Sequence, residues 1–134
     1  MFLGAKKILV VDDEKELTEM LGSFLASWGR TSVVQANTVE FALEIMKEQK
    51  IDLVISDINM HNKTGYDLLD AIRKKDKKLP FIMISGQTNI YDDKKCSPGT
   101  FKSIFAFFEK PFKFGDLKAA VSEALAGSDL RKAS

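Results

Sequence analysis

Two apolar stretches of the chain run directly into carboxylates. Near the start, "ILVVDDE" leads into Asp12, Asp13 and Glu14, and further along "VISD" ends in Asp57. Like charges held close together raise one another's pKa and cost stability, and the end of a buried strand is a poor place for a lone carboxylate. The pattern therefore favours a chemical role for these acids, provided that the fold brings them together.

Two later apolar stretches end in groups that complement the acids. Ser85 is a hydroxyl donor followed by Gly86, which has no side chain to block access, and Lys110 is an ammonium on a flexible stem followed by Pro111. Clustered carboxylates need a cation, and hard oxygen ligands, few in number, suit Mg²⁺, which also binds phosphate oxygens. An acid, a metal, a hydroxyl and a lysine are the groups that phosphoryl transfer to a carboxylate requires.

The elements that must position these residues alternate along the chain. Short apolar runs read as buried strands, and the segments between them repeat apolar residues at the 3.6 spacing of a helix. Thr38 is placed to cap the second helix. We expect strands at 7–11, 31–36, 51–56, 80–85 and 104–109, and helices at 15–28, at 39–48, after Gly65 up to "RKKDKK", and through Leu117 to Leu125, closed by Gly127.

This alternation predicts an α/β fold. Strands that are apolar on both faces and separated by helices form a parallel sheet covered on both sides. Right-handed crossovers then lead to a flavodoxin-like, doubly wound, five-stranded parallel sheet of order 2-1-3-4-5 in a three-layer αβα sandwich. Ligands bind such sheets at the carboxyl ends of the strands, beside the switch point between strands 1 and 3. Asp12, Asp13 and Asp57 should therefore meet there.

Composition limits the number of domains, the kinds of partner and the location that we expect for the protein. A chain of 134 residues, 45% of them hydrophobic, suits one domain with a real core. Twenty basic and nineteen acidic residues leave a net charge of +1, so we expect no direct nucleic acid binding. A single cysteine, Cys96, excludes an internal disulfide. The first residues do not read as a signal peptide, and no run approaches the ~20 apolar residues of a membrane span, so we expect no membrane insertion and a cytoplasmic location.

The motifs together resemble the receiver domain of two-component response regulators. The resemblance rests on the acid pair after strand 1, Asp57 at the end of strand 3, Gly65 eight residues later, Ser85-Gly86 after strand 4 and Lys110-Pro111 after strand 5. It covers nearly the whole chain, from about Lys7 to Ala126. Each dipeptide alone is a weak signal, whereas five in order, each at the end of its strand, are very specific.

The resemblance implies a role for each acid. Asp57 would accept a phosphoryl group from a sensor histidine kinase or a histidine phosphotransfer protein. Asp13 would bind Mg²⁺ directly, together with Asp57 and the backbone carbonyl of Asn59, and Asp12 would hold the metal through water. Such a domain catalyses its own phosphorylation and dephosphorylation, but it is a signalling switch and not an enzyme of metabolism.

The resemblance also implies a switch that alters the binding of a downstream effector or output domain. Lys110 would pair with the phosphoryl oxygens, and Ser85 would move to hydrogen-bond one of them. Phe107 matches the aromatic residue whose rotation follows that hydroxyl, although a phenylalanine on a strand is as often simply part of the core. The Lys110–Pro111 peptide would be cis, and Asn59 and Gln87 stand where family members tune the lifetime of the phosphate.

The stretch between strands 4 and 5 departs from the family pattern. Residues 88–100 lack the alanine-rich amphipathic helix usual there, and Ser97-Pro98-Gly99 interrupts any helical repeat. We predict an atypical fourth helix, short or distorted, with a mobile loop over roughly 92–100. Because this segment belongs to the family's usual output surface, the partner or dimer mode of other members does not transfer safely.

We divide the chain into a receiver domain, residues 1–127, and a C-terminal tail or linker, residues 128–134. The end of the sequence has no room for an output domain, so the chain is either a stand-alone receiver or a piece of a larger regulator or hybrid kinase. The linker-like "SDLRKAS" slightly favours the second reading.

Three other functions compete with the phosphorylation switch. A phosphorylation-independent receiver-like interaction module remains an alternative, because the segment around the fourth helix is unusual. An aspartate-nucleophile phosphatase would need a second aspartate where this chain has Asn59, and a longer chain. A flavodoxin would need a hydroxyl-rich loop after strand 1, where "DDEK" repels phosphate.

Overall fold

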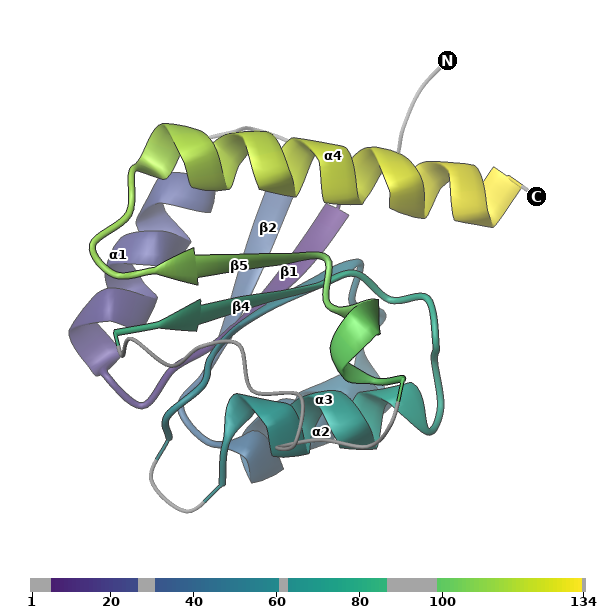
Figure 1. Cartoon of the computed structure of the whole chain (residues 1–134), viewed down its shortest axis with the longest axis horizontal. Coiled ribbons are helices and arrows are strands. Elements are labelled where there is room, and N and C mark those ends of the chain that lie inside the picture. The colour runs from purple at the N-terminus through teal and green to yellow at the C-terminus, as the bar shows by residue number, and fades with distance from the viewer. Residues whose placement is uncertain (1–5, 27–30, 61–62, 87–98, 134) are drawn as a thin grey trace.

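The computed structural model describes residues 6–26, 31–60, 63–86 and 99–133. Strands and helices alternate along the chain, as the apolar runs predicted (Figure 1). The elements are β1 (Lys6–Val11), α1 (Lys15–Ala26), β2 (Thr31–Ala36), α2 (Val39–Glu48), β3 (Leu53–Asp57), α3 (Gly65–Arg73), β4 (Phe81–Ser85), a 3₁₀ helix (Phe101–Ser103), β5 (Ala106–Glu109) and α4 (Phe114–Ala133).

The five strands form one parallel sheet in the order β2-β1-β3-β4-β5, so the predicted fold class and strand order are confirmed. Parallel pairing places the carboxyl ends of neighbouring strands side by side. Val11 at the end of β1 pairs with Ser56, Asp57 pairs with Ile84, and Ser85 pairs with Glu109. One edge of the sheet therefore collects the end of every strand, and that edge carries the predicted site.

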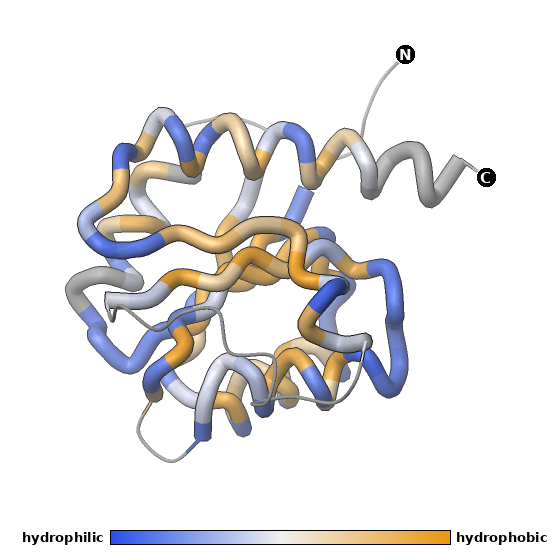
Figure 2. The backbone as a smooth tube through the Cα atoms, viewed as in Figure 1, coloured by the Kyte–Doolittle hydropathy of each residue, from blue (hydrophilic) through white to orange (hydrophobic). Residues whose placement is uncertain are grey.

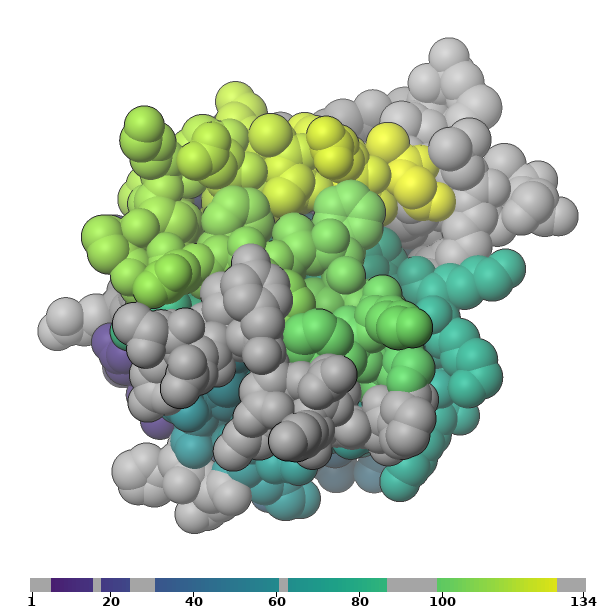
Figure 3. Space-filling model, in the orientation of Figure 1, coloured from purple at the N-terminus to yellow at the C-terminus, as the bar shows by residue number. Residues whose placement is uncertain are grey.

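Two hydrophobic layers cover the sheet. Successive strand residues point to opposite faces, so Leu9 and Val11 pack into a cluster with α2 and α3, while Ile8 and Val10 pack into a second cluster with α1 and α4. Figure 1 shows α1 and α4 on one side of the sheet and α2 and α3 on the other, and Figure 2 shows the hydrophobic strands between them. In Figure 3 the segment from the 3₁₀ helix to α4 forms one continuous surface.

Side-chain caps begin the two helices of the α2/α3 layer. The hydroxyl of Thr38 accepts a hydrogen bond from the backbone N–H of Phe41 at 3.0 Å, which confirms the predicted cap of α2. Thr64 and Asp67 form a capping box at the start of α3: the Thr64 hydroxyl accepts from the Asp67 N–H, and the Asp67 carboxylate accepts from the Thr64 N–H at 2.8 Å. Each cap supplies acceptors for N–H groups that the first helical turn leaves unpaired.

Several predicted boundaries were wrong. β3 begins at Leu53 and includes Asp57, because the ladder with β4 continues to the pair of Asp57 and Ile84. β5 begins at Ala106, since the 3₁₀ helix occupies Phe101–Ser103 just before it. The predicted end of the first helix at residue 28 lies outside the described residues, within which α1 extends to Ala26.

The last helix does not end at Gly127, as predicted, but continues to Ala133. A glycine inside a helix costs only about 1 kcal/mol relative to alanine, and Leu130, Arg131, Lys132 and Ala133 are all good helix formers. Residues 128–133 are therefore helical, and their assignment to a tail or linker stays a prediction about domain organisation.

The predicted atypical helix and loop fall mainly on residues 87–98, which lie outside the described part of the chain. The described segment resumes at Gly99, whose φ of 83° is readily adopted only by glycine. No helix among the described residues is long and apolar enough to cross a bilayer.

Candidate acidic site at the carboxyl edge of the sheet

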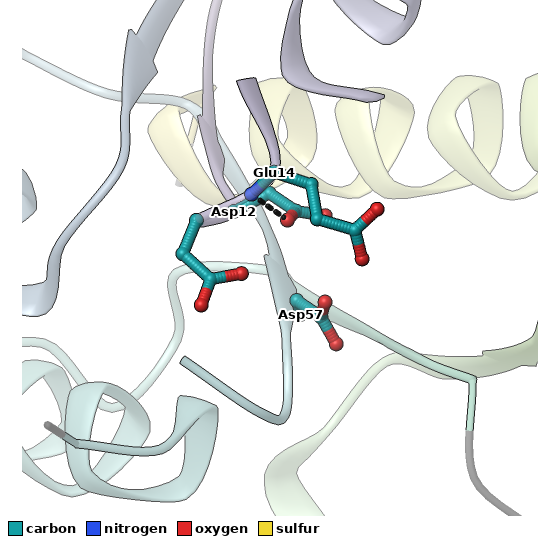
Figure 4. A group of neighbouring side chains, drawn as sticks. Asp12, Glu14 and Asp57 are labelled. Carbon is teal, nitrogen blue, oxygen red and sulfur yellow. Dashed lines mark hydrogen bonds between the residues drawn. The ribbon is translucent and has the colours of Figure 1, made fainter. Parts of the chain in front are cut away.

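Four carboxylates meet at the carboxyl ends of β1 and β3. Asp12, Asp13, Glu14 and Asp57 each place one carboxylate oxygen so that all four atoms lie within 4.8 Å of one another. Figure 4 shows the side chains of Asp12, Glu14 and Asp57 close together at this edge. The structure thus brings together the three aspartates that the sequence singled out and adds Glu14.

Burial divides this acidic cluster into two pairs. Asp12 and Asp57 are only 2% and 5% exposed to solvent, whereas Asp13 and Glu14 are exposed. Asp12 continues β1, since its backbone N–H donates to the carbonyl of Ala36 at 3.0 Å, and Asp57 is the last residue of β3. The strands therefore fix the buried pair, while the exposed pair lies on the loop that follows β1.

Lys110 supplies the counter-charge. Its Nζ lies 3.2 Å from Asp57 Oδ2, 3.7 Å from Asp12 Oδ2 and 3.8 Å from Glu14 Oε1. Its backbone N–H donates to the carbonyl of Ser85 at 2.7 Å, which continues the pairing of β4 with β5, and the Lys110–Pro111 peptide is cis, as predicted. A single ammonium thus contacts three carboxylates from two other parts of the chain.

Burial and charge shift the titration of these groups in opposite directions. Burial raises the pKa of Asp12 to about 6, against the hydrogen bond from the Glu14 N–H and the charge of Lys110, which both lower it. Burial likewise raises the pKa of Asp57, although Lys110 opposes the change. For Lys110, burial alone would lower the pKa, but Asp57 and Asp12 raise it above the ordinary lysine value. The lysine therefore compensates the buried acids only in part.

The backbone around Asp57 is tightly packed. Asp57 Oδ1 accepts a hydrogen bond from the N–H of Asn59 at 3.3 Å, and the hydroxyl of Ser56 donates to the Asp57 carbonyl at 2.8 Å. A Cβ at Gly65 would lie 2.5 Å from that same carbonyl oxygen and 2.7 Å from Met83 Sδ. Glycine at position 65 therefore lets α3 begin directly against the strand end that carries Asp57.

The structure describes three of the remaining predicted residues. Ser85 is buried at the end of β4, and Asn59 is exposed and forms an isolated bridge with Thr64. Phe107 is half-buried on β5 and packs against the α2/α3 core cluster, with its ring centroid 5.5 Å from that of Phe101. Gln87 lies outside the described residues.

Sequence reasoning gave Glu14 no role. The signal that could have found it is its position as the third consecutive acid after an apolar strand. Its backbone N–H donates to Asp12 Oδ1 at 2.7 Å, and this turn points its own carboxylate toward Lys110.

The donor set fits a hard divalent cation. The cluster offers carboxylate oxygens alone, the ligand type that Mg²⁺ prefers, and two of the four groups are buried where a lone negative charge is costly. Even with Lys110 nearby, the pKa values of Asp12 and Asp57 stay above the ordinary aspartate value. Further positive charge beside these two carboxylates would therefore be stabilising.

Comparisons with known proteins agree on one family. The family model described as the response regulator receiver domain matches residues 8–122. The chain is 34% identical over 118 residues to the transcriptional regulatory protein GlrR of Escherichia coli K12, covering 88% of this chain and 26% of that protein. It is also 32% identical over 124 residues to the Probable chemotaxis protein CheY of Rhizobium etli, covering 91% of this chain and 93% of that one.

Solved structures agree with these sequence matches. The response regulator protein TrrA of Thermotoga maritima, solved in complex with Mg²⁺–BeF, superposes with a TM-score of 0.79 at 32% identity, covering 90% of this chain and 99% of that one. The signal receiver domain of an HD domain-containing protein from Pseudomonas fluorescens Pf-5 superposes with a TM-score of 0.87 at 21% identity, which shows the shared fold. The chain spans about a quarter of the length of GlrR.

Proposed function

The chain belongs to the response regulator receiver domain family, and from this premise we propose that it is a switch phosphorylated on Asp57. The donor would be the phosphohistidine of a sensor histidine kinase or of a histidine phosphotransfer protein. One relative is itself a kinase: the sensor kinase CckA of Brucella abortus is 34% identical over 128 residues, which make up 13% of its length.

The contact between Lys110 and Asp57 is the observation that carries this proposal. The Nζ of Lys110 lies 3.2 Å from Oδ2 of Asp57, so the carboxylate at the buried end of β3 has a positive charge beside it. Asp57 would attack the phosphorus through one carboxylate oxygen, and the bond to the donor's leaving group would break with its electron pair going to that group. Lys110 would then neutralise the negative oxygens of the transferred phosphoryl group.

We propose that Mg²⁺ is held by Asp13, Asp57 and the backbone carbonyl of Asn59, with Asp12 acting through water. When bound, the metal would neutralise the charge that develops on the phosphoryl oxygens. Asp57 would thus serve both as nucleophile and as metal ligand. The compact carboxylate cluster and the raised pKa of Asp12 support this assignment.

Ser85 and Phe107 would convert phosphorylation into altered binding of an effector or output domain. Ser85 is the last residue of β4 and its carbonyl accepts from the Lys110 N–H, so it lies next to the residue that would contact the phosphoryl group. Phe107 lies two residues before the end of β5 and adjoins the ring of Phe101. A shift in the populations of this element would follow any differential contact with the phosphoryl oxygens.

The experiment is the intact mass of the protein after incubation with Mg²⁺ and acetyl phosphate. We expect a gain of one phosphoryl group in the wild type, and none in Asp57→Asn or in the presence of a chelator. Lys110→Ala should slow the gain strongly while leaving Mg²⁺ binding intact.

Two results would contradict the proposal. A gain of equal size in Asp57→Asn would place the acceptor elsewhere. A wild type that gains no mass from acetyl phosphate or from a phosphorylated histidine phosphotransfer protein, and that binds no Mg²⁺ in calorimetry, would favour the phosphorylation-independent interaction module.

A further inference from the structure

A second concave region lies at the opposite edge of the sheet from the acids. It is a cavity of about 630 Å³ between the C-terminal halves of α2 and α3, closed below by the turns that lead into β3 and β4. Figure 1 shows these two helices together on one face of the sheet. We call this cavity the α2/α3 groove.

The floor of the α2/α3 groove is apolar. Ile51, Ile72 and Leu79 are buried members of the core cluster beneath it, and Leu43 and Met46 are half-buried side chains packed against that cluster. Such a floor favours an apolar ligand group, since covering it removes hydrophobic surface from water.

The carboxylates at the rim of the groove already have partners. Glu40 forms an ion pair with Lys63 at 3.3 Å, and Glu44 forms one with Lys47 at 3.4 Å. Asp76 accepts hydrogen bonds at 2.9 and 3.0 Å from two backbone N–H groups of the turn before β4. These acids are therefore less available to a ligand than their number suggests.

The rim also carries three exposed lysines, Lys50, Lys74 and Lys75, which form no ion pair with any described residue. Lysines near the C-terminus of a helix are stabilised by the helix dipole, which accounts for their presence at this rim. Their aliphatic stems can lie along the apolar floor while the charged ends stay in water. An apolar surface bordered by ammonium groups that pair with none of the described carboxylates is complementary to a molecule with an apolar body and one anionic end.

We propose that the α2/α3 groove binds a small amphipathic carboxylate, with its hydrocarbon chain on the apolar floor and its carboxylate among Lys50, Lys74 and Lys75. The volume lies within the range of about 300–1,000 Å³ that is usual for small-molecule sites. This site is separate from the phosphorylation site, because Ile51 and Leu79 precede β3 and β4 whereas Asp57 and Ser85 end them.

The two sites share helix α3. It begins at Gly65, where an added Cβ would lie 2.5 Å from the carbonyl oxygen of Asp57, and Ile72 near its end lines the groove. A ligand that shifts α3 would therefore change the surroundings of Asp57, so binding at the groove should alter the rate of phosphorylation.

The test uses the full 134-residue chain and octanoate as ligand, with binding followed by the chemical shifts of assigned backbone amides. We expect saturable shifts concentrated at residues 43–51 and 71–79. Octanol, which has the same chain without the charge, should cause shifts at the same residues with weaker affinity, and acetate should cause none.

Three variants test the charged rim and the apolar floor separately. Lys50→Gln/Lys74→Gln/Lys75→Gln should weaken octanoate binding about tenfold and leave octanol unchanged. Lys77→Gln/Lys102→Gln/Lys113→Gln removes the same charge from exposed positions away from the lining of the groove and should leave both affinities unchanged. Ala71→Trp, at a half-buried lining position, should fill the groove and abolish both.

Thermal unfolding of each variant would show that the fold is retained. The proposal is overturned if octanoate shifts do not saturate or spread over the whole surface. It is equally overturned if the two triple variants reduce the affinity for octanoate to the same extent, since attraction by net charge alone would then explain the binding.

Discussion

β3 has a buried aspartate at each end, and the two are treated differently by their surroundings. Asp52, just before the strand, is 4% exposed, and Asp57, its last residue, is 5% exposed. The Asp52 carboxylate accepts a hydrogen bond from the backbone N–H of Lys7 at 2.9 Å, and its own N–H donates to the Lys7 carbonyl at 2.8 Å. Asp57 instead faces three other carboxylates and one ammonium.

The difference shows that equal burial can accompany very different electrostatic surroundings. Asp52 ties the start of β3 to β1 through a reciprocal pair of hydrogen bonds with one backbone residue, so its charge contributes to structure. Asp57 has a pKa raised by burial that Lys110 counteracts only in part, so its charge destabilises the fold until further positive charge, such as a cation, neutralises it.

Packing at the Asp57 end of β3 gives the largest expected effect. Gly65→Ala would force a methyl group against the Asp57 carbonyl and Met83, and we expect a loss of about 3 kcal/mol in the free energy of unfolding. Gly115→Ala is the matched control, because a Cβ there meets nothing within 4 Å, and it should leave stability equal or slightly higher. Urea unfolding of both variants measures the contrast, and equal losses would contradict the close approach of α3 to Asp57.

Acid titration should reveal the cost of the site in the metal-free protein. The pKa of Asp12 is about 6 in the folded chain against an ordinary value of 3.8, so the folded state binds more protons than the unfolded state between these values. Stability must then rise as the pH falls, and relative to Asp12→Asn we expect a gain of about 2 kcal/mol from about pH 7 to about pH 4.

Saturating Mg²⁺ should reduce this pH-dependent gain in the stability of the wild type over Asp12→Asn, because the metal favours the ionised carboxylates. Urea unfolding at a series of pH values measures it. A wild type that loses stability relative to Asp12→Asn on acidification would show that Asp12 is stabilised as a charge in the fold.

Matched isosteric changes test the two aspartates directly. Asp52→Asn weakens a hydrogen bond between a carboxylate and the backbone and should cost about 1 kcal/mol. Asp57→Asn removes a partly compensated buried charge and should raise the stability of the metal-free protein by about 1 kcal/mol. Opposite signs in urea unfolding would support the comparison, and a loss of stability in both variants would contradict it.

Glu14 should give the smallest effect. Its side chain is 67% exposed and lies 3.8 Å from Lys110, so Glu14→Gln should change stability by less than about 0.5 kcal/mol. Because Lys110 would then be shared by fewer carboxylates, we expect phosphorylation of Asp57 to change only severalfold. The rate of mass gain from acetyl phosphate measures this, and complete loss would make Glu14 part of the essential metal site.

Much of the fold could be predicted from the sequence because the signals were local and agreed with one another. β2 and α2 were predicted at their observed bounds, since a β-branched run and a capping threonine define them. The helix end at Gly127 was wrong, because a glycine ends a helix only when the residues after it do not continue the helix.

The site was harder to predict in its details. The end-of-strand rule was enough to bring Asp12, Asp13 and Asp57 together, but the part played by Glu14 depends on a turn in which its N–H bonds to Asp12. The packing role of Gly65 depends on the side chain of Met83, which is distant in the sequence, and on the backbone carbonyl of Asp57. Such contacts between distant segments have no local signature.

Lys110 follows Asp57 by 53 residues, so the ribosome completes β1 and β3 before it makes their counter-ion. At the usual speed of synthesis, this delay is roughly 3–10 s. Any nascent chain that pairs β1 with β3 in that interval brings Asp12 and Asp57 together without Lys110. A chain refolding from urea already contains Lys110, so newly made and refolded molecules should differ in how strongly magnesium ions or mild acid accelerate the first pairing of the central strands.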